Sequence, residues 1–445
     1  MIYELIKGKI IELGEGMGHE DVEFVTKTMY VHKLDGDNVL VINTKTNRCV
    51  IIPQEQKTIS KEIVDLLNAY SDKLVNTQET ATFIIAITYS CNLKCTYCYQ
   101  QHDKSLDKRL ITEVKLNEIF EIILKYKELH PEKSIDIGIF GGEPLLVSNE
   151  KIIDKIFEFC KHNRLQVHIT TNGCNLEYFL KKIIIYRNFI SGINPTIDSM
   201  KLNYATRHSL DSAHNNDKET EKLIKCLRTL LYYGVPVNLA TNLDRHNYDK
   251  IDEILDNLYD LELMNNDKFH WYLGRVDDRL YETGYKDIIF ESDIIEMLLK
   301  KNIVLPQNAH IAFLKTTYNL VNKMGYNTHQ DELKGINNYC WTSSNLDNVF
   351  YIDSNMKTYR CTYTVGRPQK SIFDFTLENL MKYEIPQKNS DSYEECTNCE
   401  IGGYCGGGCQ LSHSTNFEKC CGEEKKNFEQ FMDRIFIPYI NKILK

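Results

Sequence analysis

The residues with the clearest chemical potential in this chain are three closely spaced cysteines, Cys91, Cys95 and Cys98, in the order C-x3-C-x2-C. They follow an apolar run at residues 83–89, so we expect them on the loop that leaves a strand. Iron–sulfur clusters usually take four cysteine ligands. Three ligands would leave one iron open to hold and reduce a small molecule. A structural zinc loop is the alternative, although zinc sites usually pair C-x2-C units at both ends.

Together with Tyr97, which precedes the last of these cysteines, the spacing resembles the signature of the radical S-adenosylmethionine (SAM) superfamily. The resemblance implies a [4Fe–4S] cluster that gives one electron to SAM. The sulfonium C–S bond then breaks, and a 5′-deoxyadenosyl radical abstracts hydrogen from a substrate. The cofactor carries this step, while the protein supplies positioning and excludes water. Tyr97 is expected to belong to the SAM site.

The ends of the following strands carry further matches to this superfamily. In Gly141-Gly142-Glu143-Pro144, two glycines allow close backbone approach to a ligand, and a carboxylate can accept hydrogen bonds from an ammonium. By itself this tetrapeptide is a weak signal typical of a turn, but here it resembles the element that binds the amino group of SAM. The resemblance also places Asn172 in a turn of the SAM site, the Thr196 hydroxyl on the SAM ribose and Arg207 on the SAM carboxylate. For Asp198, which follows Thr196 by two residues, and for Arg207, a structural salt bridge is the alternative.

A second cysteine-rich region near the C-terminus resembles the SPASM extension of radical SAM enzymes, which holds two auxiliary [4Fe–4S] clusters. The resemblance gives the first auxiliary cluster three ligands, namely Cys340, Cys361 and Cys409. It gives the second auxiliary cluster Cys396, Cys399 and Cys405, with Cys420 or Cys421 as the fourth ligand. The whole chain would then bind SAM and three [4Fe–4S] clusters. One or two zinc ions are the alternative, but zinc leaves the SAM motifs unexplained.

Two positions depart from the SPASM pattern. Met356 stands where relatives commonly carry a turn glycine, and the neighbouring Asn355 can adopt a positive φ, so we expect the turn to shift by one residue. Leu346 stands where some relatives add a cysteine. Either the first auxiliary cluster keeps an iron open to a substrate thiol or water, or the spare member of Cys420-Cys421 completes it. Adjacent residues of a strand point in opposite directions, which permits the second option.

Strands and helices alternate through the middle of the chain, which predicts parallel βα units. Six such units predict an α/β fold, a partial (β/α)6 TIM-like barrel at residues 83–275, with its chemistry at the carboxyl ends of the strands. The expected strands are 83–89, 135–140, 166–171, 193–197, 235–241 and 269–274, and the expected helices include 113–129, 151–162, 218–233 and 248–261.

Three further segments surround this barrel. Residues 1–82 predict a small α+β module with a hairpin at 30–33 and 39–43, a third strand at 49–52 and one helix from Thr58. In related peptide-modifying enzymes the equivalent region is a winged-helix domain of three helices that binds a leader peptide. Because this sequence predicts only one helix, a truncated or merely structural cap is expected at least as much. Residues 276–337 predict a helical bridge with helices at 292–299 and 309–323. Residues 338–445 form the SPASM region, with a final amphipathic helix at 428–444 that packs on the barrel.

Composition agrees with a reduced, metal-binding protein. The chain has 445 residues and 15 cysteines, and its N-terminus lacks the pattern of a signal peptide, which favours cytoplasmic thiols over disulfides. Its formal net charge of −9 argues against nucleic-acid binding. No apolar run has the length of a membrane span.

The function expected first is maturation of a ribosomally made peptide by a thioether or C–C crosslink. A leader peptide would mediate recognition, and an external flavodoxin or ferredoxin would supply electrons. Anaerobic formylglycine formation on a sulfatase is the main alternative, followed by peptide epimerisation and a non-catalytic electron carrier. Asp277 and its neighbour Asp278 follow the sixth strand and are weak candidates for a general base. Cys174 is a weak candidate for a hydrogen donor.

Overall fold

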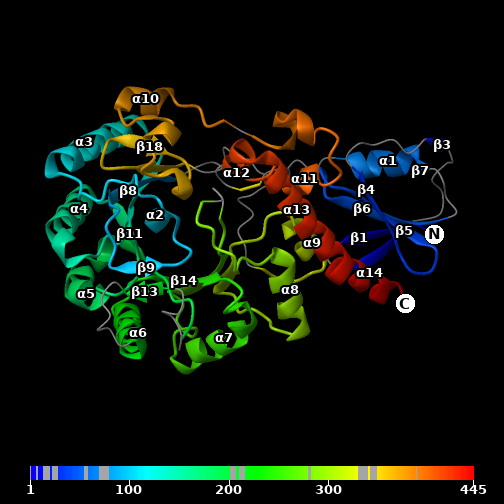
Figure 1. The fold of residues 1–445 in the computed structure, drawn as a ribbon, viewed down its shortest axis with the longest axis horizontal. Helices are drawn as coiled ribbons and strands as arrows, with labels where there is room; N and C mark the ends of the chain where they lie inside the picture. Colours follow the sequence, from blue (N-terminus) through cyan, green and yellow to red (C-terminus); the bar gives the residue numbers. More distant parts are fainter. Residues whose placement is uncertain are drawn as a thin grey trace.

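The computed structural model describes residues 2–6, 9–13, 21–22, 29–54, 59–69, 80–200, 207–209, 216–278, 282–328, 339–340, 348–386 and 388–445. A barrel of strands with outer helices forms one end of the molecule, and an antiparallel sheet near the N-terminus forms the other (Figure 1). The C-terminal helices lie between the two. Within these residues, no helix is both long and apolar enough to cross a membrane.

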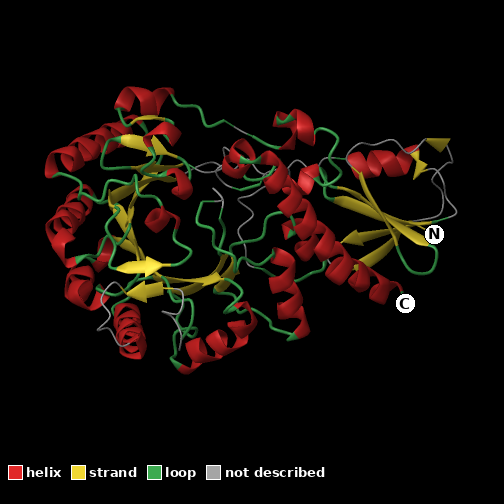
Figure 2. Cartoon of the chain, viewed as in Figure 1, coloured by secondary structure: helices red, strands yellow, loops and turns green. Residues whose placement is uncertain are grey.

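Six parallel strands form the barrel wall in chain order, which confirms the predicted α/β class. The strands are β8 (Thr80–Thr88), β10 (Ser134–Gly141), β11 (Gln166–Thr171), β12 (Ile190–Pro195), β14 (Val237–Leu243) and β15 (Phe269–Arg275). The helices that connect them are α3 (Glu113–Leu129), α4 (Glu150–Asn163), α5 (Leu176–Ile185), α6 (Asn216–Tyr232) and α7 (Ile251–Asp260), and they cover the outside of the sheet (Figure 2). The sequence had indicated all of these except α5.

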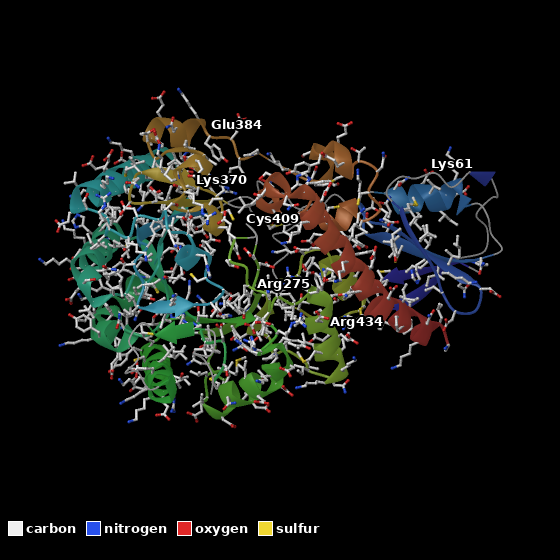
Figure 3. The ribbon with its side chains drawn as sticks, viewed as in Figure 1. Lys61, Arg275, Lys370, Glu384, Cys409 and Arg434 are labelled. Carbon is white, nitrogen blue, oxygen red and sulfur yellow. The ribbon has the colours of Figure 1, made fainter. Side chains whose placement is uncertain are left out.

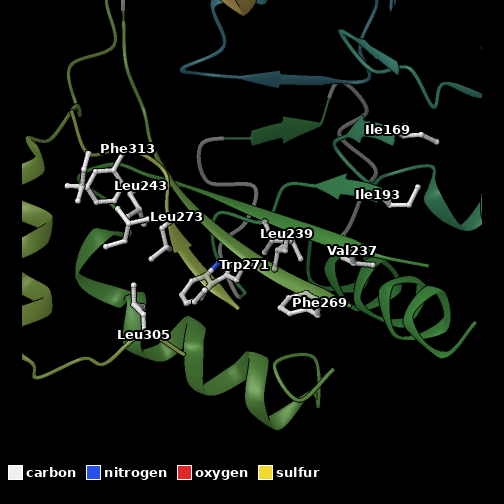
Figure 4. Close-up of a cluster of buried hydrophobic side chains, with 14 of the residues drawn as sticks. Ile169, Ile193, Val237, Leu239, Leu243, Phe269, Trp271, Leu273, Leu305 and Phe313 are labelled. Carbon is white, nitrogen blue, oxygen red and sulfur yellow. The ribbon is translucent and has the colours of Figure 1, made fainter. Parts of the chain in front are cut away.

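Alternation along each strand divides the sheet into a helix-facing side and an inner side. On β15, Phe269, Trp271 and Leu273 are fully buried, whereas the residues between them are partly exposed. The first three pack with Val237 and Leu239 of β14 in one apolar cluster beneath the helices (Figure 4). Burial of this apolar surface fixes the strand register, because a shift by one residue would exchange the two sides.

The predicted helical bridge is only partly helical. Helix α8 (Glu291–Lys300) forms as expected, but the expected helix at 309–323 is wrong in its first half. Ala309–Ile311 instead form β16, which pairs in parallel with β15, and only Tyr318–Lys323 are helical, as α9. Strand pairing with Trp271 and Leu273 outweighs local helical preference in this segment.

The cysteine-rich region extends the barrel sheet at its opposite edge, which the sequence did not predict. Strand β17 (Val349–Ile352) pairs in parallel with β8, and β18 (Lys357–Tyr359) and β19 (Phe373–Asp374) follow in antiparallel order. Helix α10 (Leu377–Lys382) packs near α3. The two ends of the sheet are therefore β16 and β19, with the six barrel strands between them.

The turn between β17 and β18 corrects the expectation for Asn355. Met356 itself has φ 61°, and its N–H donates to the carbonyl of Asp353 at 3.1 Å. Asp353 Oδ1 accepts from the N–H groups of Asn355 at 2.8 Å and Lys357 at 3.0 Å. The turn is thus held by the Asp353 side chain and has not moved by a residue. Leu346 lies outside the described residues.

The N-terminal module is a five-stranded antiparallel sheet in the order β2-β1-β6-β5-β4. Its strands are β1 (Ile2–Ile6), β2 (Lys9–Leu13), β4 (Met29–Lys33), β5 (Asn38–Asn43) and β6 (Arg48–Pro53). The short strands β3 (Asp21–Val22) and β7 (Ile59–Ser60) pair with each other, and α1 (Lys61–Asn68) packs on β6. The predicted hairpin, third strand and helix are all present, and α1 is the single helix in the described part of this module.

The C-terminal helices begin earlier than predicted and join the other parts of the molecule. They are α11 (Gly402–Cys405), α12 (Gln410–Thr415), α13 (Phe417–Phe431), a π-helical turn at Met432–Phe436 and α14 (Ile437–Leu444). Helix α13 lies against α8, where Asn427 Oδ1 accepts from the Ser292 N–H at 3.3 Å. On its other side, the ring of Phe428 meets Tyr30 of β4 at 5.0 Å.

Candidate active site

The three cysteines leave strand β8 on a loop that includes β9 (Leu93–Cys95) and α2 (Tyr99–His102), as predicted. Strand β9 pairs with β13 (Arg207–Ser209), which sets Arg207 opposite Cys95. All three cysteines keep some exposed surface as residues, although their thiols lie mostly within the protein. Cys95 and Cys98 raise the pKa of Cys91, and Cys98 raises that of Cys95. The three thiols therefore lie close enough on this loop to act on one another electrostatically.

Burial dominates the electrostatics of these thiols. It raises the pKa of Cys91 and that of Cys95 to about 12, and the neighbouring thiols act in the same direction. The Leu93 N–H, which donates to Cys91 Sγ at 3.3 Å, and the Arg207 guanidinium beside Cys95 oppose this rise. Nearby thiols of this kind are the donor set of iron–sulfur clusters. No group of three His, Cys, Asp or Glu side chains in the described residues already has the arrangement of a single-ion site.

The glycines of Gly141-Gly142 are required by the protein's own backbone. A Cβ atom at Gly141 would stand 2.0 Å from the Thr88 carbonyl oxygen, and one at Gly142 would stand 2.4 Å from the Ser90 carbonyl oxygen. The Gly142 N–H donates to Thr88 O at 2.8 Å. The start of the cysteine loop thus crosses directly over these glycines, which fixes the loop against β10.

The Glu143 side chain, for which a contact with the SAM ammonium is predicted, already has several protein partners. It is fully buried and accepts hydrogen bonds from Thr171 Oγ1 at 2.7 Å, the Leu145 N–H at 2.8 Å and the Asn172 N–H at 2.6 Å. Burial raises the pKa of Glu143, and these three donors lower it. The carboxylate therefore braces the end of β11, because protein donors already occupy it.

Asn172 and Arg207 join the strand ends to the cysteine loop. Asn172 Nδ2 donates to Asn92 Oδ1 at 2.7 Å and lies 3.7 Å from Cys91 Sγ. The Arg207 guanidinium is buried and donates to the backbone carbonyls of Asn172, at 3.3 Å, and Thr196. Arg207 thus links β11, β12 and Cys95.

Tyr97 and Asp198 form a hydrogen-bonded pair near Cys95 and Arg207. The Tyr97 hydroxyl donates to Asp198 Oδ2, and the Asn242 N–H donates to Asp198 Oδ1 at 2.9 Å. Burial raises the pKa of Asp198, whereas the charge of Arg207 and the Tyr97 hydroxyl lower it. The alternative of a structural role for Asp198 and Arg207 is therefore supported by their protein partners. The ring of Tyr97 meets that of Tyr285 edge-on at 6.1 Å.

A cavity of about 420 Å³ lies beyond Tyr285, between the end of β15 and helix α13. Arg275, which is labelled in Figure 3, lies in this central part of the molecule. The lining mixes carboxylates, cations and apolar side chains, and it comprises Arg275, Asp277, Asp278, Gly284, Tyr285, Lys286, Ile288, Ile289, Phe290, Lys419, Glu423, Glu424 and Asn427. Because Tyr285 contacts Tyr97, this cavity adjoins the cysteine loop.

The two aspartates at this cavity have different partners. Asp277 Oδ1 pairs with Arg275 Nη2 at 2.6 Å. Asp278 accepts from the backbone N–H groups of Glu282, Thr283 and Gly284 at 3.1–3.3 Å, so it holds the following loop. Cys174, the other weak candidate, lies after the β11 turn, where its N–H donates to Asn172 Oδ1 at 2.9 Å. Cys174 acts electrostatically on Arg207 and does not line this cavity.

The second cysteine region encloses a separate narrow cavity. Five cysteines line it, together with Gly408, His413 and Glu424: Cys396, Cys399, Cys405, Cys420 and Cys421. A Cβ at Gly408 would lie 3.2 Å from Cys420 Sγ and 3.8 Å from Cys405 Sγ, so both sulfurs face this glycine. Burial raises the pKa of Cys396 to about 11 and also raises that of Cys405. Glu424 contributes to the rise for Cys405.

Cys420 and Cys421 lie on helix α13 and not on a strand, which corrects the premise that they point in opposite directions. Successive helical residues differ by about 100° in direction, so both can face one cavity. Neither is set apart for the other predicted cluster. The three cysteines assigned to that cluster are partly exposed and form no disulfide: Cys340, Cys361 and Cys409. The charge of Cys409 acts on Tyr393, as do those of Cys396 and Cys420.

The structure also identifies site residues that the sequence did not. Tyr285 closes the cavity beside Tyr97, and its hydroxyl donates to Asp244. Tyr99, next to Cys98, donates to the Thr362 carbonyl at 2.7 Å and lies within reach of the charges of Cys98 and Cys361. Glu424 lines both cavities. An aromatic residue next to a cysteine of the C-x3-C-x2-C motif was the one available signal, and it applied to Tyr99 as much as to Tyr97.

Comparison with known proteins gives matches over the barrel and over most of the chain. Residues 85–258 match the Radical SAM superfamily family model. The cysteine-type anaerobic sulfatase-maturating enzyme of Clostridium perfringens is 23% identical over 383 residues, which are 78% of this chain and 94% of that enzyme. Four other curated relatives, among them a probable GTP 3′,8-cyclase of Methanococcus aeolicus at 32% identity, align over 33–56% of their own length.

Two solved structures share the fold over most of their length. Native anSMEcpe with bound AdoMet and Cp18Cys peptide superposes with a TM-score of 0.57 at 16% identity, covering 81% of this chain and 98% of that one. Streptococcus suis SuiB bound to precursor peptide SuiA superposes with a TM-score of 0.52 at 16% identity, covering 88% and 96%. At this identity, the matches establish the fold.

Proposed function

Because the chain is a radical SAM protein with a SPASM-like C-terminal region, we propose that it modifies a ribosomally made peptide by installing a thioether or C–C crosslink. One observation carries this proposal. The 420 Å³ cavity lies between the cysteine loop and the helix that carries Cys420 and Cys421, so a substrate there lies near both. Its mixture of charged and apolar lining fits a peptide, which offers both kinds of group.

The donor sets fit the groups that the family implies. Cys91, Cys95 and Cys98 would hold a [4Fe–4S] cluster, and the five-cysteine cavity would hold another. When bound, cluster and SAM supply one-electron chemistry that ends in hydrogen abstraction from the substrate. SAM would lie over the strand ends at Gly142 and Thr196. Since Glu143 is occupied internally, we infer that backbone carbonyls of this loop meet the SAM ammonium.

The chain's own residues would position these groups and move a proton. Arg207 and Asn172 hold the cysteine loop on the strand ends, and Tyr97 is fixed by Asp198. A thioether forms when a carbon loses a hydrogen atom and a thiol loses a proton, with one electron returned to a redox partner of the flavodoxin or ferredoxin class. Asp277, which lines the cavity and pairs with Arg275, would accept the thiol proton.

The N-terminal module would bind the leader of such a peptide. Among the described residues, strand β4 is the last of its sheet, so its outer edge can pair with an added strand, and Val31 on it is 47% exposed. The module is anchored to the cysteine-rich region, where Thr44 Oγ1 donates to the Glu400 carbonyl at 2.8 Å and Tyr404 OH donates to Asn47 Oδ1 at 2.7 Å. A leader on β4 would therefore be held at a fixed distance from the cavity.

The test is anaerobic reconstitution followed by mass spectrometry of a co-expressed cysteine-containing peptide from the gene neighbourhood. With SAM and dithionite, the proposal expects loss of two hydrogens for each crosslink and slower modification when the leader is removed. Formation of 5′-deoxyadenosine without any change in the peptide would contradict the assigned substrate. Absence of 5′-deoxyadenosine would contradict the chemistry as a whole.

Sulfatase maturation is the second candidate, favoured by the alignment over 94% of the Clostridium perfringens enzyme. It predicts that a sulfatase-derived peptide loses its Cys thiol or Ser hydroxyl to an aldehyde. Epimerisation would instead leave the mass unchanged in ordinary water and incorporate solvent deuterium in heavy water. The aldehyde formed from a Cys differs in mass from a crosslink because it exchanges sulfur for oxygen. The aldehyde formed from a Ser loses two hydrogens, as a crosslink does, and is identified by its reaction with a hydrazide.

A further inference from the structure

Two polar side chains accompany the five thiols in the second cysteine cavity. His413 of α12 and Glu424 of α13 both line it. Four of the five thiols are sufficient as ligands of a four-iron cluster, and the fifth is surplus. The histidine and the carboxylate are therefore not needed as ligands, so their place in this cavity requires another explanation.

The His413 ring lies between two aromatic rings, and one of its nitrogens is buried. Its ring lies 4.0 Å from that of Tyr393 and 4.6 Å from that of Phe417. In the described part of the chain, His413 Nε2 is buried and has no hydrogen-bond partner. A lone pair directed at anionic sulfur is repelled, whereas an N–H is attracted, so a filled cavity favours the tautomer with its hydrogen on Nε2.

Glu424 is buried and its carboxylate is fixed at both oxygens. The Tyr339 hydroxyl donates to Oε1 at 2.6 Å, and Thr316 Oγ1 donates to Oε2 at 2.6 Å. Its exposed fraction is 5%. A carboxylate held in this way presents a negative charge to the sulfur cavity through a medium of low dielectric constant.

We propose that His413 and Glu424 set the reduction potential of the iron–sulfur cluster in this cavity, and that they do so in opposite directions. The inference rests on the proposed function only in that the cavity holds a cluster. Reduction adds negative charge to a cluster. An N–H donated to sulfur stabilises the reduced form and raises the potential, whereas a nearby carboxylate destabilises it and lowers the potential.

The experiment is an EPR-monitored redox titration of the full-length, anaerobically reconstituted protein. The SAM-binding cluster is identified by the change of its signal when SAM is added. His413→Phe keeps the ring between Tyr393 and Phe417 but removes the donor, and it should lower one auxiliary midpoint by about 59 mV, a tenfold change for one electron. Glu424→Gln removes the charge, keeps one of the two hydroxyl donors and lets the other hydroxyl turn to accept from the amide N–H. It should raise the same midpoint by a similar amount.

Two further variants serve as controls. His413→Gln restores an N–H near the same place and should return the midpoint toward that of the wild type. Glu423→Gln neutralises the adjacent carboxylate, which lines only the cavity at the barrel mouth, and should leave the midpoint unchanged.

Unchanged midpoints in both His413→Phe and Glu424→Gln, with wild-type iron content, would overturn the inference. Loss of iron in His413→Phe would also overturn it, because His413 would then be a ligand or a structural residue. Neither result bears on peptide modification, which is measured separately. A wild-type protein with iron only in the SAM-binding cluster would overturn this inference and the auxiliary clusters of the proposed function together.

Discussion

The backbone of Gly142 lies so close to Ser90 that a Cβ atom at residue 142 would stand 2.4 Å from the Ser90 carbonyl oxygen. This contact is between two stretches of backbone, so no side chain can move to relieve it. We therefore predict that Gly142→Ala displaces the start of the cysteine loop. The iron that responds to SAM should be mostly lost, while iron elsewhere in the chain is retained.

Gly422→Ala is the matched control for this prediction. Gly422 lies on α13 beside Cys421, and a Cβ there meets nothing within 4 Å. Alanine is favoured over glycine in a helix by about 1 kcal/mol, so this variant should keep its iron and gain slightly in stability. Both variants are compared with the wild type by their iron content per chain and by the SAM-dependent EPR signal. Full retention of the SAM-responsive iron in Gly142→Ala would show that the loop can shift.

Met356 should be a site where glycine is preferred to alanine. Its φ of 61° lies in the left-handed region, which costs a residue with a Cβ about 1 kcal/mol relative to glycine. Since Met356→Gly and Met356→Ala both remove the Met side chain, the glycine variant should be more stable by about that amount. Met381 on α10 provides the reverse comparison, because a helix favours alanine. The measurement is the thermal stability of Gly and Ala variants at both positions. If the same one of the two residues were the more stabilising at both Met356 and Met381, the prediction would be wrong.

The metal-free protein should lose stability as the pH rises above 9. Burial raises the pKa of Cys91 and Cys95 from 9.0 to about 12. Between these values the thiols ionise in the unfolded chain but stay protonated in the folded chain, so higher pH favours unfolding. The expected effect is about 1 kcal/mol per thiol at pH 10. The melting temperature should therefore fall less between pH 8 and pH 10 in a C91A/C95A double variant than in the wild type, and equal falls would count against it.

Asp277→Asn should slow peptide modification without preventing SAM cleavage. The change removes the proton acceptor but keeps the side-chain shape, so product formation should fall by about 10²- to 10⁴-fold. Formation of 5′-deoxyadenosine should continue, because the residues around Cys91 are unchanged. Glu423→Gln, at the same cavity, is the control and should change the rate little. Equal losses of 5′-deoxyadenosine and product in Asp277→Asn would indicate a structural role for the Asp277–Arg275 pair.

The sequence alone was sufficient for features that depend on neighbours along the chain. The apolar run before Cys91 placed the three cysteines on the loop that leaves β8, and alternating periodicity predicted the six barrel strands in their observed order. The N-terminal hairpin followed from Asp35-Gly36-Asp37 between two alternating runs. Each of these signals lies within a short window, where side-chain direction repeats with the period of the local structure.

Only the tertiary structure decided which groups meet across long separations. Thr171 donates a hydrogen bond to Glu143, and Tyr97 donates one to Asp198, because the strand ends converge at one edge of the barrel. Strand β17 reached β8 from the cysteine-rich region, and α13 directed both Cys420 and Cys421 into one cavity. Such pairings are fixed by burial and by the need to satisfy buried polar groups, and neither depends on separation along the chain.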